Sequence, residues 1–91
     1  MKRHAWHATR HPEKILASGY VKPSRLACVY LFDTFEGAAF YGSKFGCDHV
    51  CEVVYDTHDV AGVWHPSYAG GAKVIRLKRG RMAKHVASFE V

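Results

Sequence analysis

The distribution of apolar residues predicts six short strands along the chain. Residues 4–8 alternate as in a strand, and residues 28–32 form a short, continuously apolar run that is typical of a buried strand. A third strand, at residues 50–55, alternates so that Cys51, Val53 and Tyr55 share one side. Three further strands are predicted in the second half of the chain, at residues 62–65, 73–78 and 86–91.

The first of two predicted helices lies between the first two strands. Pro12 suits its first turn, where the missing N–H is not needed, and Gly19 is placed to end it in a left-handed conformation. Ile15 and Leu16 supply its apolar side. These local signals predict a short amphipathic helix at this point.

The second predicted helix follows the strand at residues 28–32. Asp33 and Glu36 have the spacing of a capping box and are expected to open it. The small residues 37–39 allow the backbone to approach a sheet or a ligand closely, and Gly42 and Gly46 are expected to loosen and end the helix. This helix is therefore predicted to pack tightly.

Three segments are predicted to lie at the surface. Residues 21–26, marked by Pro23 and Ser24, are expected to form a loop, and residues 67–71 a mobile glycine-rich loop. The strand at residues 73–78 alternates basic with apolar side chains, which predicts an exposed edge strand.

The order of the elements predicts an α+β fold, with two short early helices and a split, mainly antiparallel sheet. The 91 residues are enough for one domain, residues 1–91, and a hydrophobic content of 48% is that of a globular chain. No apolar run is long enough to span a bilayer, and no apolar signal segment follows the basic N-terminus. We therefore expect a cytoplasmic protein that does not act at a membrane.

The net charge of +5 adds a candidate for partner binding. Basic residues gather late in the chain, at Arg76, Lys78, Arg79, Arg81 and Lys84. Such a cluster suits nucleic-acid phosphates or an acidic protein surface. The alternative is a solvated strand edge on which these charges oppose aggregation.

The three cysteines cannot form a complete set of disulfides within one chain. Cys47, His49 and Cys51 lie close together in the sequence, as zinc ligands do, but Cys28 and His58 do not form the second ligand pair of a structural zinc site. Reduced, partly buried cysteines and no metal are therefore expected.

The stretch from His4 to Tyr41 resembles the first half of the ADP-ribosyltransferase fold, in the His-Tyr-Glu class. Four segments carry the resemblance, in the family's order: His7-Ala8-Thr9, Ile15-Leu16-x-x-Gly19, Val29-Tyr30-Leu31-Phe32-Asp33 and Ala38-Ala39-Phe40-Tyr41. They are similar to the small phage and bacterial transferases and the RNA 2′-phosphotransferases. The resemblance implies a compact ADP-ribosyltransferase-like core.

The resemblance also implies a site for NAD. In the family, a histidine at the place of His7 holds the ribose hydroxyl, and the backbone at the next residue, here Ala8, holds the nicotinamide amide. Thr9 completes the motif, and Tyr30 and Tyr41 match the tyrosines that stack on the two faces of nicotinamide. Taken singly, His7 also fits a structural strand histidine, and the two tyrosines fit core aromatics.

The family's catalytic glutamate has no direct counterpart. It lies on a late strand, and the matching residues 81–86 contain no acid. Glu90 is the candidate acid, and Glu52 is a second one in a different strand. In the phosphotransferase branch, histidines and arginines serve instead, which makes His85 and Arg81 further candidates.

These residues lead to two hypotheses of function. In the first, the protein is a minimal ADP-ribosyltransferase from a phage or mobile element that binds NAD and modifies a host macromolecule, with His7, Tyr30 and Glu90 as its catalytic residues. In the second, a protein of the same fold has lost catalysis and inhibits a host defence complex by direct binding, as anti-CRISPR proteins do. A small nucleic-acid binder is a third possibility.

Overall fold

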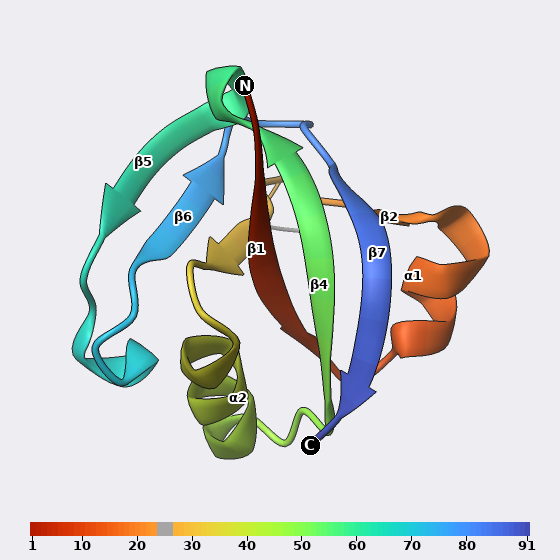
Figure 1. The fold of residues 1–91 in the computed structure, drawn as a ribbon, viewed down its shortest axis with the longest axis vertical. Helices are drawn as coiled ribbons and strands as arrows, with labels where there is room; N and C mark the ends of the chain where they lie inside the picture. Colours follow the sequence, from red (N-terminus) through yellow and green to blue (C-terminus); the bar gives the residue numbers. More distant parts are fainter. Residues whose placement is uncertain (24–26) are drawn as a thin grey trace.

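The computed structural model describes residues 1–23 and 27–91, in which seven strands, two α-helices and two 3-10 turns form an α+β fold (Figure 1). The first half contains β1 (Lys2–Thr9), α1 (Pro12–Ser18), β2 (Tyr20–Val21), β3 (Tyr30–Phe32) and α2 (Phe35–Lys44). The second half contains β4 (His49–Asp56), η1 (Thr57–Asp59), β5 (Val60–Trp64), η2 (Ser67–Ala69), β6 (Val74–Leu77) and β7 (Ala83–Glu90).

All seven strands belong to one curled antiparallel sheet, in the order β2-β7-β4-β1-β3-β6-β5. The expectation of a split sheet is therefore wrong, because hydrogen bonds connect the whole series. The pairing is thin at one place, however. Only Trp6 and Phe32 are paired between β1 and β3, whereas β1 pairs with β4 along all of its eight residues.

Each face of the sheet buries its own apolar cluster. On the face covered by α1 and β2, the cluster comprises Ala5, Ile15, Val21, Val29, Leu31, Cys51, Val53, Tyr55, Ile75, Leu77 and Ala83. On the face covered by α2 it comprises Phe32, Ala38, Val50, Ala69, Ala72 and Val74. The alternation predicted for residues 50–55 is confirmed, because Cys51, Val53 and Tyr55 all join the first cluster.

The local signals of α1 are confirmed at both ends. Pro12 is its first residue, and Gly19 ends it with φ of 79° while its N–H donates to the carbonyl of Ile15. The predicted apolar side is only half correct, because Ile15 is buried and Leu16 is exposed. A helix of seven residues covers the sheet with a single large side chain.

The predicted cap of α2 is wrong. Thr34 is the N-cap, and its hydroxyl accepts a hydrogen bond from the N–H of Gly37. Asp33 instead accepts from the N–H of Lys73 and so connects the start of α2 to the segment before β6. The expected close approach of the helix is present, since an added Cβ on Gly37 would lie only 2.3 Å from the Cβ of Ala72.

Two further expectations are corrected. The strand at residues 73–78 is not an edge strand, because β6 lies between β3 and β5, and the edges are β2 and β5. Residues 67–71 were expected to form a mobile loop, but they begin with η2, whose Ala69 is fully buried against α2. The loop predicted at residues 21–26 lies partly outside the described residues, and Val21 belongs to β2.

Among the residues that the structure describes, no helix has the length and apolar character needed to cross a membrane.

Candidate functional site

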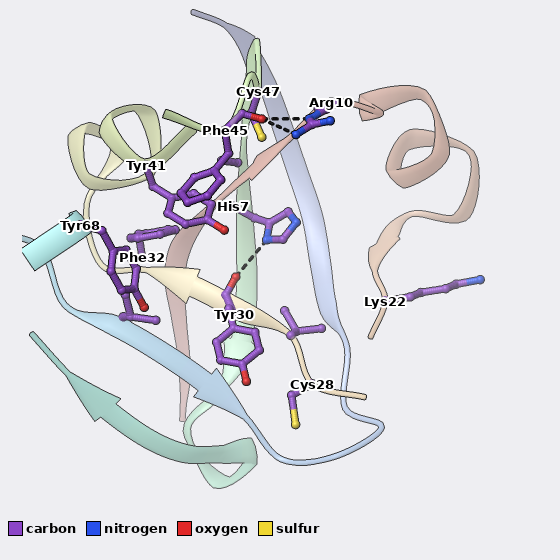
Figure 2. Close-up of a pocket in the computed structure, with 13 residues that line it drawn as sticks. His7, Arg10, Lys22, Cys28, Tyr30, Phe32, Tyr41, Phe45, Cys47 and Tyr68 are labelled. Atoms are coloured by element: carbon purple, nitrogen blue, oxygen red, sulfur yellow. Dashed lines mark hydrogen bonds between the residues drawn. The ribbon is translucent and has the colours of Figure 1, made fainter. Parts of the chain in front are cut away.

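A cavity of about 510 Å³ opens where β1 and β3 separate (Figure 2). Five aromatic residues contribute to its walls: Tyr30, Phe32, Tyr41, Phe45 and Tyr68. His7 and Ala8 of β1 line it as well, as do Arg10 and Lys22. Its apolar walls and few polar groups are typical of a small-molecule site.

The cavity results from the short pairing between β1 and β3. Beyond Trp6 and Phe32, the antiparallel register would bring Ala8 opposite Tyr30, but no such pair forms. Instead, the side chain of His7 contacts the backbone of β3, and its Nδ1 lies 3.0 Å from the carbonyl oxygen of Tyr30. Because a carbonyl only accepts hydrogen bonds, Nδ1 carries the proton and donates it.

This contact fixes the chemical state of His7. Burial removes water from the ring and lowers its pKa, although the hydrogen bond to Tyr30 opposes part of that shift. A neutral ring with its proton on Nδ1 has an unprotonated Nε2. His7 therefore presents a hydrogen-bond acceptor at the cavity.

Tyr41 lies at the centre of an aromatic cluster. Its ring centroid is 5.2 Å from that of Phe32, 4.5 Å from that of Phe45 and 5.8 Å from that of Tyr68. Burial raises the pKa of its phenol, with smaller contributions from Cys47 and Tyr68. The phenol stays neutral, and the cluster gives the cavity a rigid wall for a planar ring.

Tyr30 and Tyr41 line the same cavity but do not face each other as a clamp. The Tyr30 ring packs edge-on against Trp64, with centroids 6.2 Å apart. In Figure 2 the Tyr30 ring points away from the Tyr41 cluster. A planar ligand between His7 and Tyr41 would thus stack on one tyrosine.

Positive charge lies at the border of the cavity. Arg10 is held there because its Nε donates to the carbonyl oxygen of Phe45, at 3.0 Å. Lys22 also lines the cavity, and in Figure 2 its side chain extends away from the other labelled residues. Of the described residues that line this cavity, none is acidic. The site can therefore bind an aromatic group that carries an anion.

A second cavity of about 450 Å³ adjoins the first one. Both are lined by His7 and Lys22, so His7 lies between them. Thr9 lines this second cavity and not the first, together with His11 and Lys14. The residues of the motif at positions 7–9 therefore line two adjoining cavities.

The acids considered for catalysis lie outside both cavities. Glu90 is at the end of β7, 84% exposed, with its Oε2 4.0 Å from Nε2 of His49. Glu52 is hydrogen-bonded to His4, whose Nδ1 lies 2.7 Å from its Oε2. His7 and Tyr30 thus meet at the cavity, but Glu90 does not join them.

His85 and Arg81, the basic residues considered in place of the catalytic glutamate, contact residues outside the cavities. Nε2 of His85 lies 2.8 Å from the hydroxyl of Ser88, and Nε of Arg81 lies 3.5 Å from Asp59. Neither residue lines the cavities.

The cysteines are free, and they do not form the zinc site considered from the sequence. Cys51 is buried in the sheet, which raises the pKa of its thiol, while Ser88 lies 3.4 Å away and lowers it in part. Cys28 and Cys47 line the first cavity. Within residues 1–23 and 27–91, no three metal-ligating side chains are grouped around a common point.

Several cavity residues were not identified from the sequence. Phe45 and Cys47 follow α2, Arg10 precedes α1 and Lys22 follows β2, so all four lie in connections between elements. Their proximity to His7 depends on strand pairing, and no local pattern indicates it. Tyr68 lines the cavity, whereas His65 does not.

Comparison with known proteins gave no match: no family model, no curated protein and no solved structure is similar to this chain.

Proposed function

We propose that the protein binds NAD in the cavity between β1 and β3 and is an ADP-ribosyltransferase-like protein. The observation that carries the proposal is the meeting of His7, Ala8, Tyr30 and Tyr41 at one cavity, from three separate segments of the chain: β1, β3 and α2. The resemblance in the first half of the sequence selects the same four residues for NAD. If these residues were only core residues, nothing would require them to line the same cavity.

The cavity residues suit the parts of NAD. Nε2 of His7 accepts a hydrogen bond from a ribose hydroxyl, and the Tyr41 cluster offers an aromatic face to nicotinamide. Arg10 and Lys22 supply positive charge for the pyrophosphate. The second cavity, with Lys14, gives room for the rest of a dinucleotide.

In the transfer reaction, the bond between nicotinamide and ribose breaks, and ADP-ribose passes to a nucleophile of a host macromolecule. The ribose becomes positively charged as nicotinamide leaves, and an anionic side chain nearby stabilises this charge. The described cavity residues include no carboxylate. We therefore expect NAD binding to be the stronger property and transfer to be slow.

The lack of a carboxylate also supports the second candidate function. In this alternative, the protein is catalytically inactive and inhibits a host defence complex in the cytoplasm by direct binding. The edge strand β5 suits such contact, because Val63 and Trp64 expose 52% and 37% of their surface and the outer edge of this strand is unpaired.

Calorimetric titration with NAD tests the proposal. The parent protein should bind, His7→Ala and Tyr41→Ala should weaken binding at least tenfold, and His65→Ala, an exposed histidine outside the cavity, should not. Equal affinity of the parent and His7→Ala, or no binding at all, would refute NAD binding in this cavity.

Incubation with labelled NAD and cell lysate separates the two candidates. Label on a macromolecule that disappears with His7→Ala supports the transferase. A partner captured equally by the parent and by His7→Ala, without label, supports the inhibitor. The result of this assay does not depend on knowing the acceptor.

A further inference from the structure

The aromatic residues of the cavity continue onto the open surface beside it. Six of them form what we call the aromatic tract: Trp64, Tyr30, Phe32, Tyr41, Phe45 and Tyr68. Tyr30 and Phe32 alternate along β3, so their rings lie on the same face of the sheet. Ring contacts form two groups, Trp64 with Tyr30 and Tyr41 with Phe32, Phe45 and Tyr68, and β3 links the two groups because it carries both Tyr30 and Phe32.

The tract is more exposed than a core requires. Trp64, Phe45 and Tyr68 expose 37%, 49% and 38% of their surface. Trp64 stands at the edge strand β5 and meets the tract through Tyr30 alone, edge to face. Burial in the apolar core therefore does not account for these rings, whereas stacking with a planar partner would cover them.

Arg76 adds a positive charge next to this surface. In the sheet it is paired with Tyr30 on one side and with Gly62 on the other. Directly opposed side chains of an antiparallel pair lie side by side, so Arg76 and Tyr30 are neighbours on one face. Arg76 is exposed, and no ion pair engages it within the described part of the chain.

Gly62 leaves the space beside Arg76 and Trp64 open. Gly62 and Trp64 alternate along β5 and share a face, and an added Cβ at Gly62 would meet nothing within 4 Å. A flat group can therefore approach the Trp64 ring from the side of Gly62. The structure thus combines an exposed tryptophan, open space at Gly62 and a cation that has no ion pair among the described residues.

Two other basic residues of the cluster, Arg81 and Lys84, do not continue this surface. Arg81 is paired with Asp59, and Lys84 lies on β7, which is separated from β6 by β4, β1 and β3. The basic cluster of the sequence is therefore divided in the fold. Arg76 is the member that lies next to the aromatic tract, and Arg10 and Lys22 border the tract at the cavity.

We propose that the aromatic tract binds a single-stranded polynucleotide, with a base stacked on Trp64 and a neighbouring phosphate contacted by Arg76. Stacking of bases on exposed aromatic rings beside cations is the recurring solution for single strands, since every base has a π-face. A duplex cannot bind in this way, because its bases are already stacked. The net charge of +5 agrees with a polyanionic ligand.

Binding of the single-stranded polynucleotide does not require that NAD also binds. The further idea that the polynucleotide is the acceptor of ADP-ribose rests on the proposed function. It is suggested by the position of the stacked base next to Tyr30, which also lines the cavity. The two proposals are tested separately: His7→Ala should weaken NAD binding and leave polynucleotide binding unchanged, whereas Trp64→Ala should weaken polynucleotide binding and leave NAD binding unchanged.

Fluorescence anisotropy with labelled dT10, U10 and a duplex of ten base pairs tests the proposal. The parent should bind at least one single strand in 50 mM salt, and the duplex at least tenfold more weakly. Trp64→Ala should weaken single-strand binding about tenfold, as expected for the loss of one stacked base, and Trp64→Tyr should restore most of it. The comparison of dT10 with U10 shows which sugar is preferred.

Arg76→Ala and Lys84→Ala form a matched pair of charge removals. Arg76→Ala should weaken binding and lower the slope of log affinity against log salt by about one. Lys84→Ala should leave both nearly unchanged. Equal effects of the two variants, full binding by a folded Trp64→Ala, equal affinity for the duplex, or no binding of either single strand would each overturn the proposal.

Discussion

At the scale of single residues, His7 has the most unusual position in the chain. Its Nδ1 satisfies a backbone carbonyl that β1 and β3 leave unpaired, and its Nε2 remains available at the cavity. One side chain thus closes a gap in the sheet and offers an acceptor to a ligand. The sequence motif at residues 7–9 indicated the ligand role, but the contact with Tyr30 follows only from the separation of the two strands.

The lowered pKa of His7 predicts a pH dependence of stability. The unfolded chain has the ordinary value near 6.5 and takes up a proton below that pH before the folded chain does. The free energy of unfolding therefore falls as the pH drops below about 6.5, and His7 has no such effect well above it. In His7→Gln, which cannot titrate, the decrease should be smaller.

Urea titrations at pH 7.5 and pH 5 measure this difference. The exposed His65 provides the control, because His65→Gln should behave as the parent does. A parent and a His7→Gln variant that lose the same free energy of unfolding between the two pH values would contradict a lowered pKa of the partly buried His7.

At the scale of elements, the contact between α2 and η2 shapes the wall of the cavity. Gly37 of α2 packs directly on Ala72, and Ala69 of η2 is fully buried against the helix. Tyr68, in η2, thereby reaches Tyr41 of α2. The small residues at 37–39 indicated a close approach from the sequence, but not that the segment after β5 is the partner.

Gly37→Ala should therefore destabilise the protein although alanine favours helices. The new methyl group would lie 2.3 Å from the Cβ of Ala72 and 3.3 Å from the carbonyl oxygen of Ala69, so η2 would have to move. Overpacking of this kind costs about 1–3 kcal/mol. Thermal and urea unfolding measure it, with Gly62→Ala as the control, since a methyl group there meets open space. Unchanged stability of Gly37→Ala would show that η2 yields without cost.

At the scale of the whole molecule, stability is expected to decrease from the centre of the sheet to its edges. β4 is paired along its length, with β1 on one side and β7 on the other, whereas β2 and β5 each have one paired side. Opening a central strand breaks two ladders and exposes both apolar clusters.

Amide hydrogen exchange measures this gradient directly. The amides of β4 and β1 should exchange most slowly, and those of β2 and β5 several orders of magnitude faster. If β5 exchanged as slowly as β4, its outer edge would have to be covered, which would favour the candidate function as a binding protein.

The sequence by itself determined both helices, six of the seven strands and the face that several of their residues bury. The alternation of Cys51, Val53 and Tyr55, the proline and glycine at the ends of α1, and the small residues of α2 all act over a few positions, so their effect is readable locally. A shared site for His7, Tyr30 and Tyr41 was also predicted, from a resemblance in their order, and the structure brings these residues to one cavity.

The tertiary structure alone decided which strands are neighbours. A strand pattern specifies a period and an apolar face, but the same pattern fits many partners, and the choice depends on burying both faces of the sheet at once. This choice placed β6 inside the sheet, separated Arg76 from Lys84 and left Glu90 far from the cavity. It also ended the pairing of β1 and β3 after one residue pair, and that early end of pairing is the physical origin of the site.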